Sequence, residues 1–145
     1  MLEYFYKEKR TLVDFRRGPL GPLFDGFARH LKECGYCQHT CQNALGQCCT
    51  YNAFLIENGI TRAGSITPAL ADAFVAGYVA HIKSPDGLYI ATHSVRRSLR
   101  LLSEYLIATG TIKPVIVKPA KFPYSWILEW IGGTKALFKR CLTFP

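Results

Sequence analysis

The chain has 145 residues, 49% of them hydrophobic, and its 18 lysines and arginines exceed its 10 aspartates and glutamates, for a net charge of +8. A chain of this length and apolar content can bury one core without disulfide or metal support, which excludes an intrinsically disordered protein. No stretch approaches the roughly 20 apolar residues of a membrane span, and residues 1–7 lack the pattern of a signal peptide. We therefore expect a soluble domain in the cytoplasm, with reduced cysteines and no membrane partner.

The positive charge is concentrated toward the C-terminus. Residues 1–91 carry nine basic and eight acidic side chains, whereas residues 92–145 carry nine basic side chains and only two acidic ones. Such a local excess favours a polyanion, most often nucleic acid, because lysine and arginine neutralise phosphates and release counterions. The alternative is a basic surface that serves only solubility.

The first predicted elements are an arm and two helices. Residues 1–19 mix aromatic and charged side chains and end in Arg-Arg-Gly-Pro, which predicts an extended N-terminal arm. A first helix is expected to start after Gly21-Pro22 and to run to about Cys34, because apolar residues recur there every three or four positions. A second helix is expected from the N-cap Thr40 to Asn58, because the glycine that follows suits the position that closes a helix.

Two more helices are expected in the second half of the domain. The third begins at Thr67, with a proline next to it, and ends at a Ser-Pro-Asp-Gly turn over residues 84–87. The fourth runs from Thr92 to Gly110. Its apolar side chains align along one side of the helical wheel: Val95, Leu99, Leu102 and Leu106.

The expected fold class is all-α, a four- to five-helix bundle over residues 20–112. Residues 113–123 contain three prolines and three lysines, which predicts an extended basic linker. Residues 124–131 form a short amphipathic piece, so that residues 113–145 as a whole are expected to be a linker with a short helical tail.

The fourth predicted helix carries the strongest functional signal. Arg96, Arg97 and Arg100 project with His93 from the side opposite the apolar stripe, so the helix can be anchored while these groups remain free. Guanidinium groups bind phosphates and guanine edges, which favours double-stranded DNA as the partner, although a merely solvated face has the same pattern. Further candidate DNA contacts lie on the second helix and in the linker: Gln38, His39, Gln42, Asn43, Gln47, Lys113, Lys118 and Lys121.

A cluster of cysteines raises a metal hypothesis. Cys34, Cys37, His39 and Cys41 supply enough thiolate and imidazole ligands for a tetrahedral zinc site. Against this, Cys41 falls on the predicted core side of the second helix, where free cysteine packs as a small hydrophobe, and no second Cys-x-x-Cys follows. We expect no metal ion and no other cofactor.

The order of glycines, prolines and apolar residues resembles a known family. The run from Val13 to Ala28 (Val-Asp-Phe-Arg-Arg-Gly-Pro-Leu-Gly-Pro-Leu-Phe-Asp-Gly-Phe-Ala), the helix end at Phe54–Ile60 and the later order of residues 96–107 and 124–128 resemble the start of bacterial phage-type integrases, which are tyrosine recombinases. The resemblance implies a SAM-like, core-binding domain that grips DNA during integration and recombination, close to the nucleoid. It also implies other recombinase protomers as partners.

The resemblance implies no catalytic residue and no small-molecule substrate. The catalytic arginines, lysine, histidine and tyrosine of tyrosine recombinases lie in a C-terminal domain, and none of their positions can be matched here. The sequence His93-x-x-Arg96, followed by Tyr124, imitates such a site. It lacks the further cationic groups that stabilise a phosphoryl-transfer transition state, so we expect no enzymatic activity.

The resemblance ends near Ile131, after which the residues suggest a truncated or frame-shifted integrase. The alternative function is a helical protein-interaction module or an inactive integrase remnant. Such a module would expose apolar side chains, for which the candidates are Phe54, Tyr105, Trp126 and Trp130.

Overall fold

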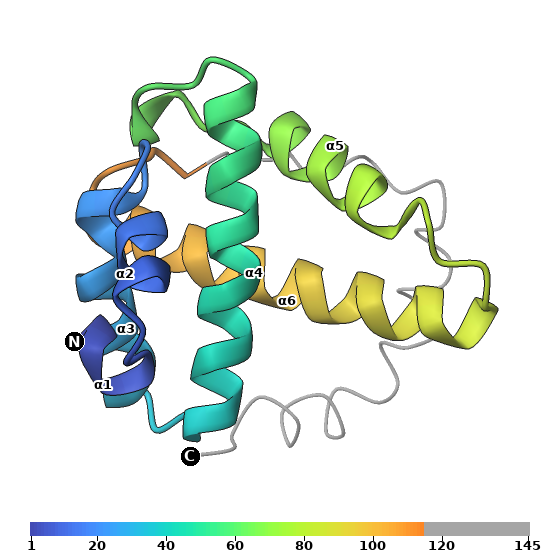
Figure 1. Ribbon diagram of the computed structural model, residues 1–145. Helices are drawn as coiled ribbons and strands as arrows, with labels where there is room; N and C mark the ends of the chain where they lie inside the picture. The colour runs from blue at the N-terminus through green and yellow to red at the C-terminus, as the bar shows by residue number, and fades with distance from the viewer. Residues whose placement is uncertain (115–145) are drawn as a thin grey trace, which may run out of the picture. The chain divides into compact units, whose positions relative to one another are not determined.

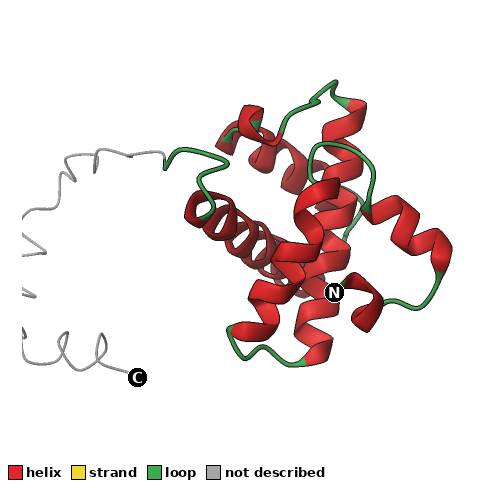
Figure 2. Ribbon diagram, turned by 90° about the vertical axis from the view of Figure 1, so that its left-hand side faces the viewer, coloured by secondary structure: helices red, strands yellow, loops and turns green. Residues whose placement is uncertain are grey.

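The computed structural model describes residues 1–114, and every regular element in that range is helical (Figures 1 and 2). The elements are α1 (Leu2–Phe5), α2 (Lys9–Phe15), a 3₁₀ turn (Gly21–Leu23), α3 (Phe24–Glu33), α4 (Gln38–Glu57), a second 3₁₀ turn (Ala63–Ser65), α5 (Pro68–Val79) and α6 (Pro85–Ala108). The predicted all-α bundle is confirmed. None of these helices is both long and apolar enough to cross a membrane. The predicted linker beyond Pro114 and the amphipathic piece after it lie outside the described residues.

Helix α4 lies between the other long helices, where it crosses α6 and packs against α3 and α5 (Figure 1). The apolar stripe predicted for the fourth helix is buried there: Val95, Leu99, Leu102 and Leu106 on α6. On α4, helical spacing predicts a buried stripe from Cys41 to Ile56, of which Cys41, Leu45, Cys48 and Leu55 are buried, whereas Cys49 is half-buried and Ile56 is exposed. Burial of each large side chain of this kind contributes roughly 1.5–3 kcal/mol. Packing of these stripes therefore holds the bundle together and leaves the opposite side of α6 to solvent.

Residues 1–19 do not form the extended arm that their sequence suggests. They form α1 and α2, which bury apolar side chains, Phe15 among them, in the common core. The ring centroid of Phe15 lies 4.8 Å from that of Tyr6 and 5.1 Å from that of Phe24, within the range of favourable aromatic contacts. The mixture of aromatic and charged residues thus encodes two short amphipathic helices. Each is too short to be stable alone and depends on this packing.

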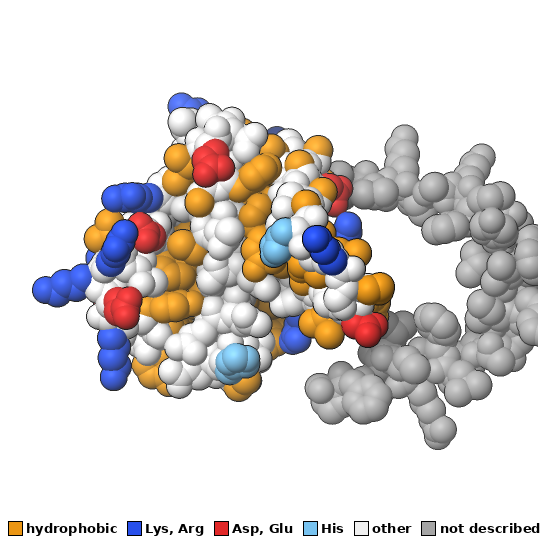
Figure 3. Space-filling view, turned by 45° about the vertical axis from the view of Figure 1, so that its right-hand side comes forward, with side chains coloured by type: hydrophobic (Ala, Val, Ile, Leu, Met, Phe, Trp, Pro, Cys, Tyr) orange, Lys and Arg blue, Asp and Glu red, His pale blue; other side chains and the backbone are white. Residues whose placement is uncertain are grey.

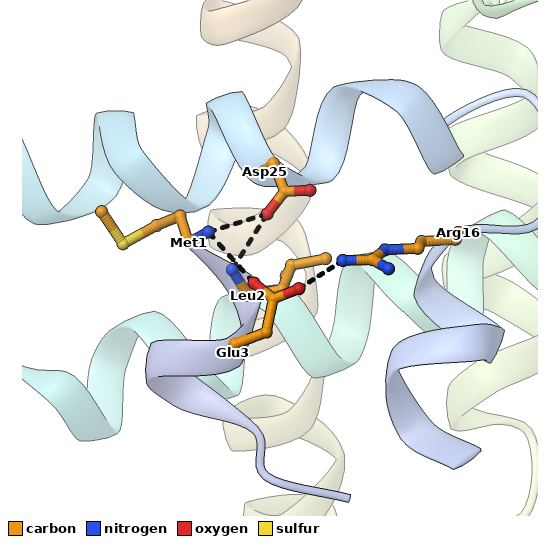
Figure 4. Close-up of polar contacts among 5 residues, drawn as sticks. All are labelled: Met1, Leu2, Glu3, Arg16 and Asp25. Carbon is orange, nitrogen blue, oxygen red and sulfur yellow. Dashed lines mark hydrogen bonds and ion pairs between the residues drawn. The ribbon is translucent and has the colours of Figure 1, made fainter. Parts of the chain in front are cut away.

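Polar contacts fasten the start of α1 to α3 (Figure 4). The Met1 ammonium and the Leu2 backbone N–H both donate to Asp25 Oδ1, each at 3.0 Å. Glu3 accepts from the Met1 ammonium at 3.2 Å and also pairs with the guanidinium of Arg16. The Leu2 N–H, a first-turn donor that has no partner within α1, is satisfied in this way.

Helix α6 begins at Pro85 rather than at the predicted Thr92. Ser84 is its N-cap and accepts a hydrogen bond from the Gly87 N–H at 3.4 Å, while Pro85 occupies the first helical turn. Ser-Pro-Asp-Gly is favoured both in a turn and at a helix start, because each uses a side-chain oxygen cap and the fixed φ of proline. The first turns of α6 therefore extend beside α5, past the crossing with α4 (Figure 1).

A polar contact sits at the crossing of α4 and α6. Gln47 Nε2 donates to Ser94 Oγ at 2.9 Å, and Ser98 Oγ donates to Gln47 Oε1 at 2.5 Å. Gln47 is half-buried and Ser98 is buried. The pair fixes the rotation of α6 about its own axis, because only one face of the helix brings both serines to Gln47.

Asn52 is the other polar anchor of α4. It is 1% exposed, its Oδ1 accepts from the Leu20 N–H at 3.1 Å, and its Nδ2 donates to the Arg17 carbonyl at 2.6 Å. These bonds pair backbone groups of the loop between α2 and α3, at the point where Gly18 adopts a φ of 70°. The side chain therefore holds the N-terminal helices against α4.

Candidate nucleic-acid interface

Four cationic or titratable side chains occupy one side of α6. Arg96 and Arg97 each lie three or four residues from both His93 and Arg100, so all four share the helix face opposite Val95 and its apolar neighbours. All four are exposed. Helix α6 is long and its other side is buried in the core, so this face presents the arginines on a rigid element.

Two of the three arginines have acidic neighbours at the edge of ion-pair range. Arg96 lies 4.0 Å from Asp72 of α5, and Arg100 lies 3.7 Å from Glu104 one turn further along α6. Every partner in these pairs is more than 60% exposed. Surface pairs of this length contribute only about 0–1 kcal/mol, so a phosphate can replace either carboxylate at little cost.

Arg97 has a different neighbour. Its guanidinium lies over the ring of Tyr36, 5.8 Å from the centroid, and among residues 1–114 no carboxylate lies within ion-pair distance of it. A cation at this distance from a tyrosine face is held weakly and keeps its hydrogen-bond donors free. Arg97 is therefore the arginine of this face best placed to meet an anion.

We call the surface of α6 formed by His93, Arg96, Arg97 and Arg100 the arginine face. A small hollow lies between this face and α4. It encloses about 90 Å³, and Arg97 and Ser94 of α6 line it together with His39 and Asn43 of α4. Imidazole and amide groups donate and accept hydrogen bonds, whereas guanidinium only donates. The crossing of α4 and α6 thus combines a cationic group with side chains able to contact base edges.

The other predicted DNA contacts differ in how close the structure places them to the arginines of α6. Gln38 and His39 are exposed at the start of α4, on the part of the helix that lines this hollow, and Lys113 is exposed at the end of the described chain. Lys118 and Lys121 lie outside the described residues. Hence only the start of α4 is brought to the arginines of α6 within the described chain.

Gln42 and Gln47 are engaged inside the fold, which corrects their predicted place on a DNA-reading face. Gln42 Nε2 donates to the Phe5 carbonyl at 2.9 Å, and the backbone carbonyl of Gln42 accepts from the Tyr6 hydroxyl at 2.7 Å. Burial raises the pKa of Tyr6 to about 12. Gln47 bonds to α6 as described above. Both amides therefore position helices, and periodicity alone could not separate them from the exposed Asn43.

Two aromatic neighbours of the arginine face are not predicted from the sequence. Tyr36 lies beneath Arg97, and the ring of Tyr89 lies 4.4 Å from that of His93 on the first turns of α6. Tyr89 lies four residues before His93, so on a helix the two side chains are neighbours. The sequence would have indicated this contact only if α6 had been predicted to begin at Pro85, before Tyr89, rather than at Thr92. Tyr36 lies in a loop and shows no periodicity.

The cysteines show no preformed metal centre within the described chain. Among residues 1–114 no group of three or more metal-ligating side chains lies close enough together to hold an ion. Cys41 and Cys48 are buried, and burial raises the pKa of both thiols. Cys34 and Cys37 are exposed on the loop between α3 and α4.

Of the four apolar residues that the sequence suggests as exposed, the two within the described chain are not fully exposed. Phe54 packs against Tyr51 and Phe74, and Tyr105 packs against Phe27, so both are half-buried. Trp126 and Trp130 lie outside the described residues. Among residues 1–114, the large apolar side chains with the greatest exposure are Tyr89 and Ile90, at 66% each.

Comparison with known proteins adds no relative. No family model, no curated protein and no solved structure matches this chain.

Proposed function

We propose that this chain is a DNA-binding module that holds double-stranded DNA against α6 and carries out no catalysis of its own. The observation that carries the proposal is the row of exposed arginines on α6, with Arg97 free of any carboxylate partner among residues 1–114 and next to His39 and Asn43. The resemblance of the sequence to phage-type integrases supports the same assignment. The module then corresponds to the core-binding region of a site-specific recombinase.

Binding in this proposal is mainly electrostatic. Arg96, Arg97 and Arg100 neutralise backbone phosphates, and each contact releases counterions, so affinity depends strongly on salt. Phosphate contacts fix the position of the protein but carry little sequence information. His39 and Asn43 add direct contacts to bases, and weak sequence preference follows from their small number.

Charge-matched variants test the proposal. We expect substitution of Arg96, Arg97 and Arg100 by glutamine to weaken binding of a double-stranded oligonucleotide by roughly tenfold or more, because about three phosphate contacts are lost. Glutamine keeps a high helix propensity, so α6 stays folded. The control is the triple substitution of Lys7, Lys9 and Arg10 by glutamine, which removes the same charge from exposed positions at and before α2. Equal weakening by both variants would reject the α6 face as the binding site.

Self-association is the second candidate function, and one observation favours it. Leu88, Tyr89 and Ile90 are 40%, 66% and 66% exposed in consecutive positions on α6. Hydrophobic side chains are spread widely over the side of the molecule shown in Figure 3. Exposed apolar groups of this kind are typical of protein contacts. Sedimentation of the chain and of an Ile90→Glu variant tests this candidate, which predicts an oligomer that the substitution dissociates; a monomer in both cases rejects it.

A further inference from the structure

The loop between α3 and α4 carries two exposed thiols. Cys34 is the C-cap of α3 and Cys37 is the N-cap of α4. Between them, Gly35 reverses the chain with a φ of 82°, a conformation that glycine adopts without strain. The Cys-x-x-Cys spacing therefore places both sulfur atoms on one tight connection that is open to solvent.

The surroundings of each thiol suit thiol–disulfide exchange. Cys37 Sγ lies 3.1 Å from Thr40 Oγ1 in the first turn of α4. The hydroxyl and the backbone N–H of Thr40 favour the thiolate and hold the pKa of Cys37 below its ordinary value. Cys34 Sγ lies 3.6 Å from His30 Nε2, which can accept its proton in the tautomer that carries hydrogen on Nδ1. Buried cysteines such as Cys48 have neither exposure nor a stabilised thiolate.

We propose that Cys34 and Cys37 form a redox-active dithiol that low-molecular-weight disulfides such as oxidised glutathione close to an intramolecular disulfide. The Cys37 thiolate attacks one sulfur of glutathione disulfide, the S–S bond breaks, and one glutathione thiolate leaves. Cys34 then gives its proton to His30 and attacks the Cys37 sulfur, which releases the second glutathione. The two cysteines lose two electrons, and glutathione disulfide gains them as two glutathione molecules.

The disulfide acts on the arginine face through Tyr36, and this step rests on the proposed function. Tyr36 lies between the two cysteines in sequence, its backbone N–H donates to the Leu31 carbonyl at 3.3 Å, and Arg97 lies over its ring. Closing a ring across four residues restricts the backbone of Gly35 and Tyr36. The position of the Tyr36 ring beneath Arg97 changes, and with it the affinity of this face for DNA.

Mass spectrometry of the full chain tests the dithiol without reference to DNA. After equilibration in glutathione buffers of increasing disulfide fraction and quenching with an alkylating agent, we expect a species that has lost two hydrogens, with the bond mapped to the peptide containing Cys34 and Cys37. Cys37→Ser should abolish it, whereas Cys49→Ser should leave it unchanged. Full alkylation of both thiols in oxidising buffer, or pairing with other cysteines, overturns the proposal.

DNA binding of the two redox forms tests the coupling. We expect the oxidised and reduced chains to differ at least threefold in affinity for a double-stranded oligonucleotide, and the double variant Cys34→Ser with Cys37→Ser to show no redox dependence. A disulfide that forms without any change in affinity overturns the coupling. Loss of DNA binding in both forms while the disulfide still forms contradicts the proposed function, whereas intact binding without a disulfide contradicts only the dithiol.

Discussion

The side-chain oxygen of Gln47 and the hydroxyl of Ser98 lie 2.5 Å apart, where α4 crosses α6. Because Ser98 is buried and Gln47 also donates to Ser94, this contact sets which side of α6 faces the core and which side presents Arg97. An amide that looks exposed in the sequence thus orients the candidate DNA-binding face.

Substitution of Gln47 by alanine tests this role. We expect it to lower the free energy of unfolding by about 1–3 kcal/mol, since two serine hydroxyls at the crossing lose a partner. Urea denaturation measures the change. The control is Asn43→Ala, the exposed amide one turn earlier on α4, for which surface position predicts a change within about 0.5 kcal/mol. Similar losses in both variants would contradict the orienting role of Gln47.

Substitution of Asn52 should lower the stability of the protein more than substitution of Gln47. Asn52→Ala leaves the Leu20 N–H and the Arg17 carbonyl without their partner in a site where Asn52 is 1% exposed, so we expect a loss of roughly 2–4 kcal/mol. Thermal denaturation followed by circular dichroism measures it. Asn58→Ala is the matched control, because Asn58 is exposed at the C-cap of α4 and, within the described chain, its amide bonds only to the Phe54 carbonyl of the last turn. A loss at Asn52 no greater than that at Asn58 would argue against this anchor.

Substitution of Tyr51 should raise the stability of the protein, in contrast to the losses expected at Gln47 and Asn52. Its side chain is 2% exposed, and its hydroxyl has no hydrogen-bond partner among residues 1–114. Tyr51→Phe removes a buried polar group that receives no compensation, so we expect the protein to become more stable by up to about 1 kcal/mol. Tyr6→Phe is the contrast, since it removes a hydroxyl that donates to Gln42 and should cost about 1 kcal/mol. Destabilisation by Tyr51→Phe would show that the hydroxyl is satisfied.

The contacts between α1 and α3 predict a pH window for stability. The pKa of the Met1 ammonium is raised above 8.0 by its hydrogen bonds to Asp25 and Glu3, so its contribution is present below pH 8 and is lost as pH rises through the raised value. The pKa of Asp25 is lowered from 3.8, chiefly by the Leu2 N–H. Its contribution is present above about pH 4 and disappears as pH falls through the lowered value.

Denaturation midpoints between pH 3 and pH 10 measure this window. We expect a plateau from about pH 5 to pH 8, with a decline on both sides. Asp25→Asn should flatten the alkaline decline, because it removes the main acceptor of the Met1 ammonium. An alkaline decline of the same size in the Asp25→Asn variant would contradict the role of this pair.

The sequence predicts that the long helices exist because strong signals coincide in them, but two of their starts are wrong. Helix α4 begins at Gln38 with Cys37 as its N-cap, so the predicted cap Thr40 lies within its first turn, and α6 begins at Pro85. Thr67 caps α5 as expected, with its hydroxyl accepting from the Leu70 N–H, and the stripe from Val95 to Leu106 is buried. The errors fall where one local pattern fits two structures. Ser-Pro-Asp-Gly serves a turn or a helix start, and the aromatic residues of the first 19 positions become helical only through tertiary contacts with residues such as Phe24.

The candidate site is predictable in part for the same reason. Helical spacing predicts that His93, Arg96, Arg97 and Arg100 share one face of α6. The sequence does not predict their partners from other elements, because contacts such as that of Tyr36 with Arg97 depend on how helices cross. Periodicity predicts which residues share one face of a helix. It does not predict which residues of other elements contact that face, because those contacts form only when the chain packs.

The most direct test of the central claim is a fluorescence-anisotropy titration of the unmodified chain with duplex DNA at several salt concentrations. Three phosphate contacts by the α6 arginines predict that the logarithm of the association constant falls linearly with the logarithm of salt concentration, with a slope of about −3 or steeper. Absence of binding at low salt, or an affinity that does not change with salt, would contradict the assignment of α6 as a DNA-binding face.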